Sequence, residues 1–211
     1  AMAQKLNPMT IGTSLPGATY FVDGQRYTET TVFTWAEGTS HVVQFPFSVD
    51  QNGILDVQYL TYGSRYRFHG WTKTYAGPDP GDFADEIEVV VASSQFTSLI
   101  ANLTIEYRVR LNFPQAFTSN YCQEFITNDQ PTDTIDLFGV VFFNGDCINR
   151  STEYWLEPGS YPVQAYNYPG WVFTGVTGDD QLFRPKPMTF NLEVNATLEY
   201  TFRWEPAKRI R

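Results

Sequence analysis

The chain repeats itself, and this repeat constrains the fold more than any other feature. Four blocks of the first half recur in the same order in the second half. They pair residues 17–24 with 139–145, 33–43 with 153–163, 66–71 with 171–176, and 102–109 with 195–202. The repeat predicts two copies of one module, related by internal duplication, with longer loops in the first copy.

Apolar and polar side chains alternate along the strands of the repeated blocks. In residues 102–109 one face carries Leu103, Ile105, Tyr107 and Val109, and the other carries Asn102, Thr104, Glu106 and Arg108. A period of two with one wet face is typical of antiparallel sheets. Aromatic residues make up 17% of the chain, which also suits strands. The predicted fold class is all-β, with two tandem antiparallel β-sandwich domains of Ig-like type.

The repeat also predicts the domain boundaries. Domain 1 covers residues 15–111, a linker covers 112–131, and domain 2 covers 132–211. Residues 1–14 form an N-terminal arm that either completes its own sheet or is donated to an edge strand of a neighbouring copy. The predicted assembly residues of this arm are Met9, Thr10 and Ile11.

Cysteines and sequons favour an extracellular or cell-surface location. Cys122 and Cys147 are the only cysteines, and one disulfide is the simplest interpretation, with reduced core thiols as the alternative. Three Asn-x-Ser/Thr sequons predict N-glycosylation sites at Asn102, Asn149 and Asn195. The alternation places Asn102 on a solvent-facing side.

Charge and composition exclude several classes of function. The formal net charge of −9 would repel a phosphate backbone, so no nucleic-acid partner is expected. No run of 18 apolar residues exists, so no transmembrane segment is expected. The sequence has two histidines, His41, which is expected on the outward face of its strand, and His69. It contains no G-x-S-x-G nucleophile elbow whose serine either histidine could activate. We therefore expect no catalytic residues, no enzyme activity and no cofactor.

Two weaker sites remain open. The acidic loop around residues 77–86 offers hard oxygen ligands that suit Ca²⁺, although such loops are commonly just solvated. Exposed tyrosines could stack on a glycan, and the candidates share one strand phase. The candidate calcium ligands are Asp79, Asp82, Asp85 and Glu86, and the candidate stacking residues are Tyr166 and Tyr168.

The order of these motifs resembles a known family. Residues 17–109 read V-D-G, F-x-W-x-E-G-x-S-H, R-Y-x-F-x-G-W and N-L-T-I-E-Y, and residues 139–202 follow the same order more loosely. This order resembles the extracellular β repeat modules of bacterial and archaeal surface proteins, of PEGA type and divergent internalin B type. The resemblance implies small β-sandwiches that are strung along surface proteins or appended to secreted enzymes, without catalytic residues of their own.

Three classes of function remain open. The favoured one is a non-catalytic structural or adhesive surface protein, such as a pilus-like filament subunit assembled by β-strand addition. Its partners would be copies of itself or other cell-surface proteins, with covalent N-glycans. The alternatives are a carbohydrate-binding module and an accessory β module of a larger secreted enzyme.

Overall fold

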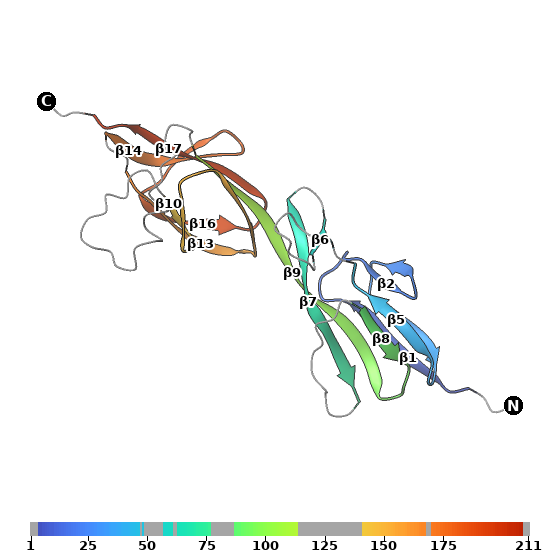
Figure 1. Ribbon diagram of the computed structural model, residues 1–211. Helices are drawn as coiled ribbons and strands as arrows, with labels where there is room; N and C mark the ends of the chain where they lie inside the picture. The colour runs from blue at the N-terminus through green and yellow to red at the C-terminus, as the bar shows by residue number, and fades with distance from the viewer. Residues whose placement is uncertain are drawn as a thin grey trace. The chain divides into compact units, whose positions relative to one another are not determined.

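The protein is all-β throughout the residues described by the computed structural model, which are 4–46, 48, 57–60, 63–76, 87–113, 141–167 and 170–208 (Figure 1). It divides into two compact units, Ala1–Glu106 and Tyr107–Arg211. The division lies inside strand β9 (Phe96–Asn112), and residues 114–131 of the predicted linker lie outside the described residues. Strand β9 thus contributes its first part to unit 1 and its last part to unit 2.

Unit 1 contains two sheets. The first has the strand order β6-β7-β9-β1-β4, and the second has the order β3-β2-β5-β8. The strands before β9 are β1 Leu6–Thr13, β2 Tyr20–Val22, β3 Gln25–Tyr27, β4 Thr31–Ala36, β5 Ser40–Gln44, β6 Val57–Tyr59, β7 Ser64–Tyr75 and β8 Ile87–Val91. One apolar cluster draws on both sheets, with Met9 and Ile11 from the first and Val43 and Val90 from the second.

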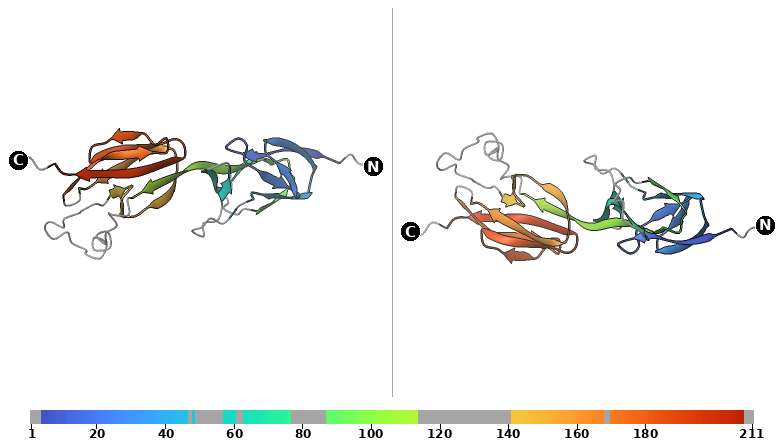
Figure 2. Two further views of the ribbon diagram at one scale, coloured as in Figure 1. Left: turned by 90° about the horizontal axis from the view of Figure 1, so that it is seen from above. Right: turned by 90° about the horizontal axis from the view of Figure 1, so that it is seen from below.

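Unit 2 also contains two sheets. The last part of β9 joins the order β15-β14-β17-β9-β12, and the second sheet has the order β11-β10-β13-β16. The strands are β10 Val141–Phe143, β11 Asp146–Ile148, β12 Thr152–Leu156, β13 Gly159–Ala165, β14 Trp171–Gly178, β15 Phe183–Pro185, β16 Thr189–Val194 and β17 Leu198–Pro206. Figure 2 shows β14 and β17 side by side. The core again takes residues from both sheets, among them Leu111, Val163 and Phe202.

The first and last strands of each unit pair in parallel, which corrects the prediction of purely antiparallel sheets. In unit 1, residues 10–13 of β1 pair with 98–101 of β9. In unit 2, residues 109–112 of β9 pair with 198–201 of β17. The alternation could not distinguish the two arrangements, because side chains alternate with a period of two in both.

The two copies of several predicted blocks have matching backbone features. The hairpin turns at Asp23 and at Asn144 both have positive φ, which the Asp-Gly and Asn-Gly dipeptides at these positions favour. In the third block Gly70 (φ 111°) and Gly175 (φ 150°) both lie in the left-handed half of φ space in the middle of a strand. These positions therefore keep the order that the repeat predicted.

The fourth block is shifted relative to its prediction. The parallel partner of Ile11 is Leu99, and the parallel partner of Leu111 is Tyr200. If Ile11 and Leu111 are equivalent, Tyr200 corresponds to Leu99, whereas the sequence comparison aligned it with Tyr107. The misalignment arises because β9 continues past the end of unit 1, so its later residues belong to a different part of the module.

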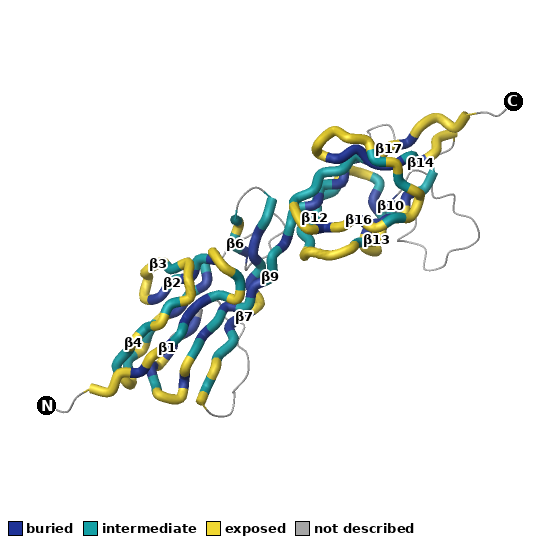
Figure 3. The backbone as a smooth tube through the Cα atoms, turned by 180° about the vertical axis from the view of Figure 1, so that it is seen from behind, coloured by how far each residue is buried: buried dark blue, intermediate teal, exposed yellow. Residues whose placement is uncertain are grey.

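Burial along β9 differs from the simple two-faced pattern (Figure 3). Leu103 and Val109 are buried as expected, but Glu106, which was expected to face solvent, is only 4% exposed. Its carboxylate accepts a hydrogen bond from Arg65 Nε at 2.6 Å and another from Arg67 Nη1 at 3.3 Å. Arg65, on the neighbouring strand β7, is itself buried, so this face carries a buried ion pair instead of facing solvent.

Candidate functional site

Several predicted site residues lie outside the described part of the chain. These are Cys122, Tyr168 and all four candidate calcium ligands, Asp79, Asp82, Asp85 and Glu86. Cys147, on β11, is disulfide-bonded. Its pairing with Cys122 stays a prediction. Among the residues that are described, no group of three or more His, Cys, Asp or Glu side chains could hold a metal ion.

The three sequons differ in exposure. Asn195 is exposed in the turn before β17. Asn149 is half-buried after β11. Asn102 lies inside β9, is half-buried, and donates from Nδ2 to Thr72 Oγ1 at 2.7 Å. A glycan on Asn102 would break that bond, so Asn195 is the sequon most open to modification.

The predicted assembly residues lie in β1. Thr10 pairs with Val32 of β4 and with Ser98 of β9, and the side chains of Met9 and Ile11 are 1% and 0% exposed in the core of unit 1. Of the two alternatives left open for the N-terminal arm, this is the one in which it completes the sheet of its own chain. Donation to a neighbour would require β1 to leave this position.

The predicted stacking residue Tyr166 is half-buried rather than a free platform. Its ring packs edge to face on Phe142, with centroids 5.8 Å apart and an interplanar angle of 72°. Its carbonyl also accepts a hydrogen bond from Trp204 Nε1. The residue therefore covers the outer side of the β10–β11 hairpin.

The most polar cluster of unit 1 surrounds His41. His41 Nδ1 lies 2.7 Å from Asp23 Oδ2, and His41 Nε2 lies 2.9 Å from Thr39 Oγ1. Trp35 stacks on the imidazole with centroids 3.7 Å apart and planes at 9°. The side chain of His41 is only 18% exposed, so it does not face outward as expected. Val42, its neighbour, is the exposed residue of this pair.

An Asp–His–Thr series resembles the hydrogen-bonded series of a hydrolase, but its donors are arranged differently. Thr39 Oγ1 lies 2.7 Å from the Ala36 carbonyl, which can only accept, so the hydroxyl donates there and accepts from His41 Nε2. The amides of Gly38 and Thr39 are also used, donating to the carbonyls of Ala92 and Ala36. The cluster therefore holds the β4–β5 turn against its strands. His41 donates to the Thr39 hydroxyl in this arrangement, so it is not placed to accept the proton of that hydroxyl.

The electrostatics of Asp23 fit this structural role. Burial acts to raise the pKa of Asp23, but hydrogen bonds from His41 and the Val42 amide, together with the charge of His41, hold that pKa below its ordinary value. In unit 2, Tyr161 makes a comparable link, because its hydroxyl donates to the Glu157 carbonyl in the β12–β13 turn. Both units thus fasten this turn with a ring from the following strand.

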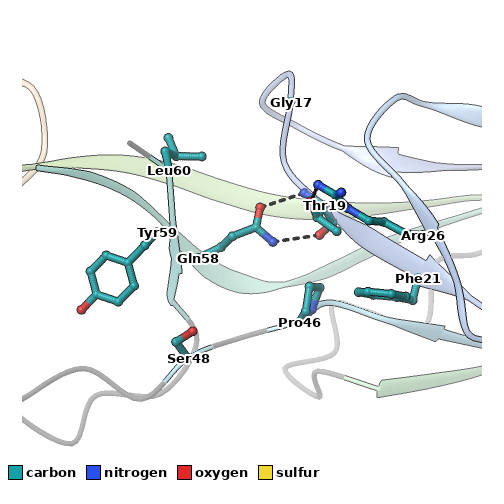
Figure 4. A pocket seen from close by; sticks show the side chains of 9 residues that line it. All are labelled: Gly17, Thr19, Phe21, Arg26, Pro46, Ser48, Gln58, Tyr59 and Leu60. Atoms are coloured by element: carbon teal, nitrogen blue, oxygen red, sulfur yellow. Dashed lines mark hydrogen bonds between the residues drawn. The ribbon is translucent and has the colours of Figure 1, made fainter. Parts of the chain in front are cut away.

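A shallow pocket of about 460 Å³ lies where the β2–β3 hairpin meets β6 (Figure 4). Gln58 fixes its floor by accepting from the Thr19 amide at 2.7 Å and donating to the Thr19 carbonyl at 3.1 Å. Arg26 and Phe21 stand on one side of it, and the ring of Tyr59 points away from Gln58 (Figure 4). The sequence analysis missed Phe21 and Arg26, although the two-residue Asp23–Gly24 turn would have paired them across the hairpin.

The comparisons with known proteins add no relative. No protein family model matches the chain, and no curated protein matches it. The resemblance to PEGA-type and internalin B-type repeats therefore stays a prediction. No helix that could span a membrane occurs among the described residues.

Proposed function

We propose that this chain is a non-catalytic, load-bearing protein of the cell surface, built from two copies of one β-sandwich module. The observation that carries the proposal is the parallel pairing of the first and last strands of each unit, β1 with β9 and β9 with β17. Tension on the chain enters each unit through one of these strands and leaves through the other.

This pairing resists tension for a geometric reason. Two parallel neighbours that are pulled from opposite ends slide along each other, and their hydrogen bonds run across the strands. All of these bonds are then loaded together rather than one after another. Forced unfolding is governed by the unfolding barrier, so simultaneous loading raises the force that the unit withstands.

The matching pairings of Ile11 and Leu111 support a duplication. Ile11 pairs with Thr31 of the edge strand β4, and Leu111 pairs with Thr152 of the edge strand β12. Each of them also lies beside the last strand of its unit. On this proposal, strand β9 supplies the last strand of one copy and the first strand of the next.

Two features support a location outside the cell. Cys147 is disulfide-bonded, and stable disulfides are typical of oxidising compartments. Asn195 is an exposed sequon. Copies of the chain could assemble into a pilus-like filament if β1 exchanged between neighbours, and other surface proteins are the alternative partners.

Single-molecule pulling in two directions tests the proposal. We expect a high unfolding force when the chain is pulled from its two ends. Pulling through attachments at Lys5 and Glu37 should unfold unit 1 at a clearly lower force, because these residues flank the paired ends Leu6 and Ala36 of antiparallel strands, which would then unzip. Equal forces in the two directions would refute a load-bearing role for the parallel pairs.

A further inference from the structure

The outer side of the β2–β3 hairpin presents an aromatic ring beside a cation. Phe21 and Arg26 are direct partners across the hairpin, so their side chains share one face. Phe21 is half-buried, Arg26 is exposed, and both line the pocket together with Pro46 and Ser48 (Figure 4). A ring, a cation and a hydroxyl therefore converge on one concave surface.

Arg26 keeps most of its hydrogen-bonding capacity for a ligand. Its only side-chain hydrogen bond to the described residues runs from Nη2 to Thr19 Oγ1 at 3.1 Å, and it makes no ion pair with any of them. A guanidinium has five N–H donors in a planar fork that matches a carboxylate. The hydrogen bond to Thr19 orients this guanidinium. Thr19 is itself held by Gln58, which hydrogen-bonds both its backbone amide and its backbone carbonyl.

The matching pair in unit 2 carries no cation. The partner pair there is Phe142 and Cys147, at the matching place in the β10–β11 hairpin. Tyr166 covers the Phe142 ring, and Cys147 is held in a disulfide. Phe21 has no comparable ring partner among the described residues. The two hairpins have the same pairing register, but the ring is paired with an exposed arginine in unit 1 and with a disulfide-bonded cysteine in unit 2.

The pocket also depends on strand β6, which supplies Gln58. β6 lies between the second and third repeated blocks, where the first copy is the longer one. In the described part of unit 2, no strand separates β13 from β14. An insertion that adds a pocket to one copy of a scaffold is where binding function is commonly found.

We propose that this pocket binds a carboxylated sugar, such as a uronic acid unit of an acidic polysaccharide. Arg26 would hold the carboxylate through charge-assisted hydrogen bonds. The apolar face of the pyranose would lie over the Phe21 ring, and the Ser48 hydroxyl would contact a sugar hydroxyl. This site goes beyond the load-bearing role, because it gives one module a specific ligand.

Titration of the ¹⁵N-labelled full chain with trigalacturonic acid tests the proposal. We expect chemical-shift changes centred on Thr19, Phe21, Arg26 and Ser48, and binding that weakens as salt is added. The fully methyl-esterified trisaccharide has the same rings without the charge and should bind at least about tenfold more weakly.

Matched variants separate the site from general charge effects. Arg26→Gln should weaken binding of trigalacturonic acid by roughly 10- to 100-fold. Arg203→Gln is the control, because Arg203 is also exposed and also donates to a threonine hydroxyl, Thr177 Oγ1, but lies in unit 2. Phe21→Leu keeps an apolar side chain and should weaken binding about two- to tenfold through loss of the ring.

Four results would overturn the proposal. They are the absence of shift changes at millimolar trisaccharide, equal binding of the methyl ester, equal losses in Arg26→Gln and Arg203→Gln, and tighter binding of hexaglutamate, which would indicate an acidic polypeptide. Thermal unfolding of each variant shows whether it is folded. Pulling experiments are independent of all four, so failure of this site would leave the load-bearing proposal standing.

Discussion

Shortening Ile11 of β1 and Leu111 of β9 in turn tests whether the last part of β9 belongs to unit 2 and not to unit 1. Their side chains are 0% and 1% exposed, and they lie in the separate cores of unit 1 and unit 2. Replacing either by alanine removes buried methyl groups and leaves a cavity, which costs about 2–5 kcal/mol. For a unit of this size, a loss of about 3 kcal/mol lowers the melting temperature by roughly 10–25 °C.

Differential scanning calorimetry resolved into two transitions is the assay. Ile11→Ala should lower one transition and Leu111→Ala the other, and the double variant should show both losses within about 0.5 kcal/mol of their sum. Val32→Ala is the control, because Val32 is 63% exposed and its truncation should cost no more than about 0.5 kcal/mol. If Leu111→Ala lowered the same transition as Ile11→Ala, or lowered neither, the assignment of residues 107–112 to unit 2 would be refuted.

Three further predictions concern single side chains. Glu106→Gln removes the charge that compensates the buried Arg65 and should cost about 3–5 kcal/mol in urea unfolding, whereas a loss below about 1 kcal/mol would show that this pair is not needed. Folding lowers the pKa of Asp23, so its carboxylate stabilises the fold above the unfolded value of 3.8, and that contribution is lost as the pH falls through the folded pKa. Asp23→Asn, which removes the titrating carboxylate beside His41, should therefore flatten the loss of stability below pH 3.8, and an unchanged acid profile would contradict it. Gly175→Ala should destabilise unit 2 by more than about 2 kcal/mol, because its Cβ would lie 2.2 Å from a backbone carbonyl oxygen at φ +150°, and an unchanged melting temperature would contradict that strain.

Local patterns predicted the strands and turns well. Of the predicted apolar face, Leu103 and Val109 are buried and Ile105 and Tyr107 are half-buried. The Asp-Gly and Asn-Gly dipeptides after Val22 and Phe143 favour the positive φ that both hairpin turns adopt. These features depend on residues that are close in sequence. Each of them could therefore be read from a single window of the chain.

Features that depend on distant strands were missed. The parallel pairing of β1 with β9 is invisible to alternation, and Glu106 is buried only because β7 brings Arg65 beside it. The open pair of Phe21 and Arg26 was missed because no motif marks it, although the short turn fixes the register of the hairpin. The pair stands out only when it is compared with the matching pair in unit 2, Phe142 and Cys147, which has no cation.

Amide hydrogen exchange along β9 tests most directly whether one strand closes the first unit and opens the second. We expect slow exchange in residues 98–101, which lie beside β1, and equally in residues 107–112, which pair with β12 over 107–111 and with β17 over 109–112. The claim that both units share β9 would be contradicted if residues 98–101 were protected while residues 107–112 exchanged at the rate of an unfolded chain. It would show instead that the chain after Glu106 is a linker.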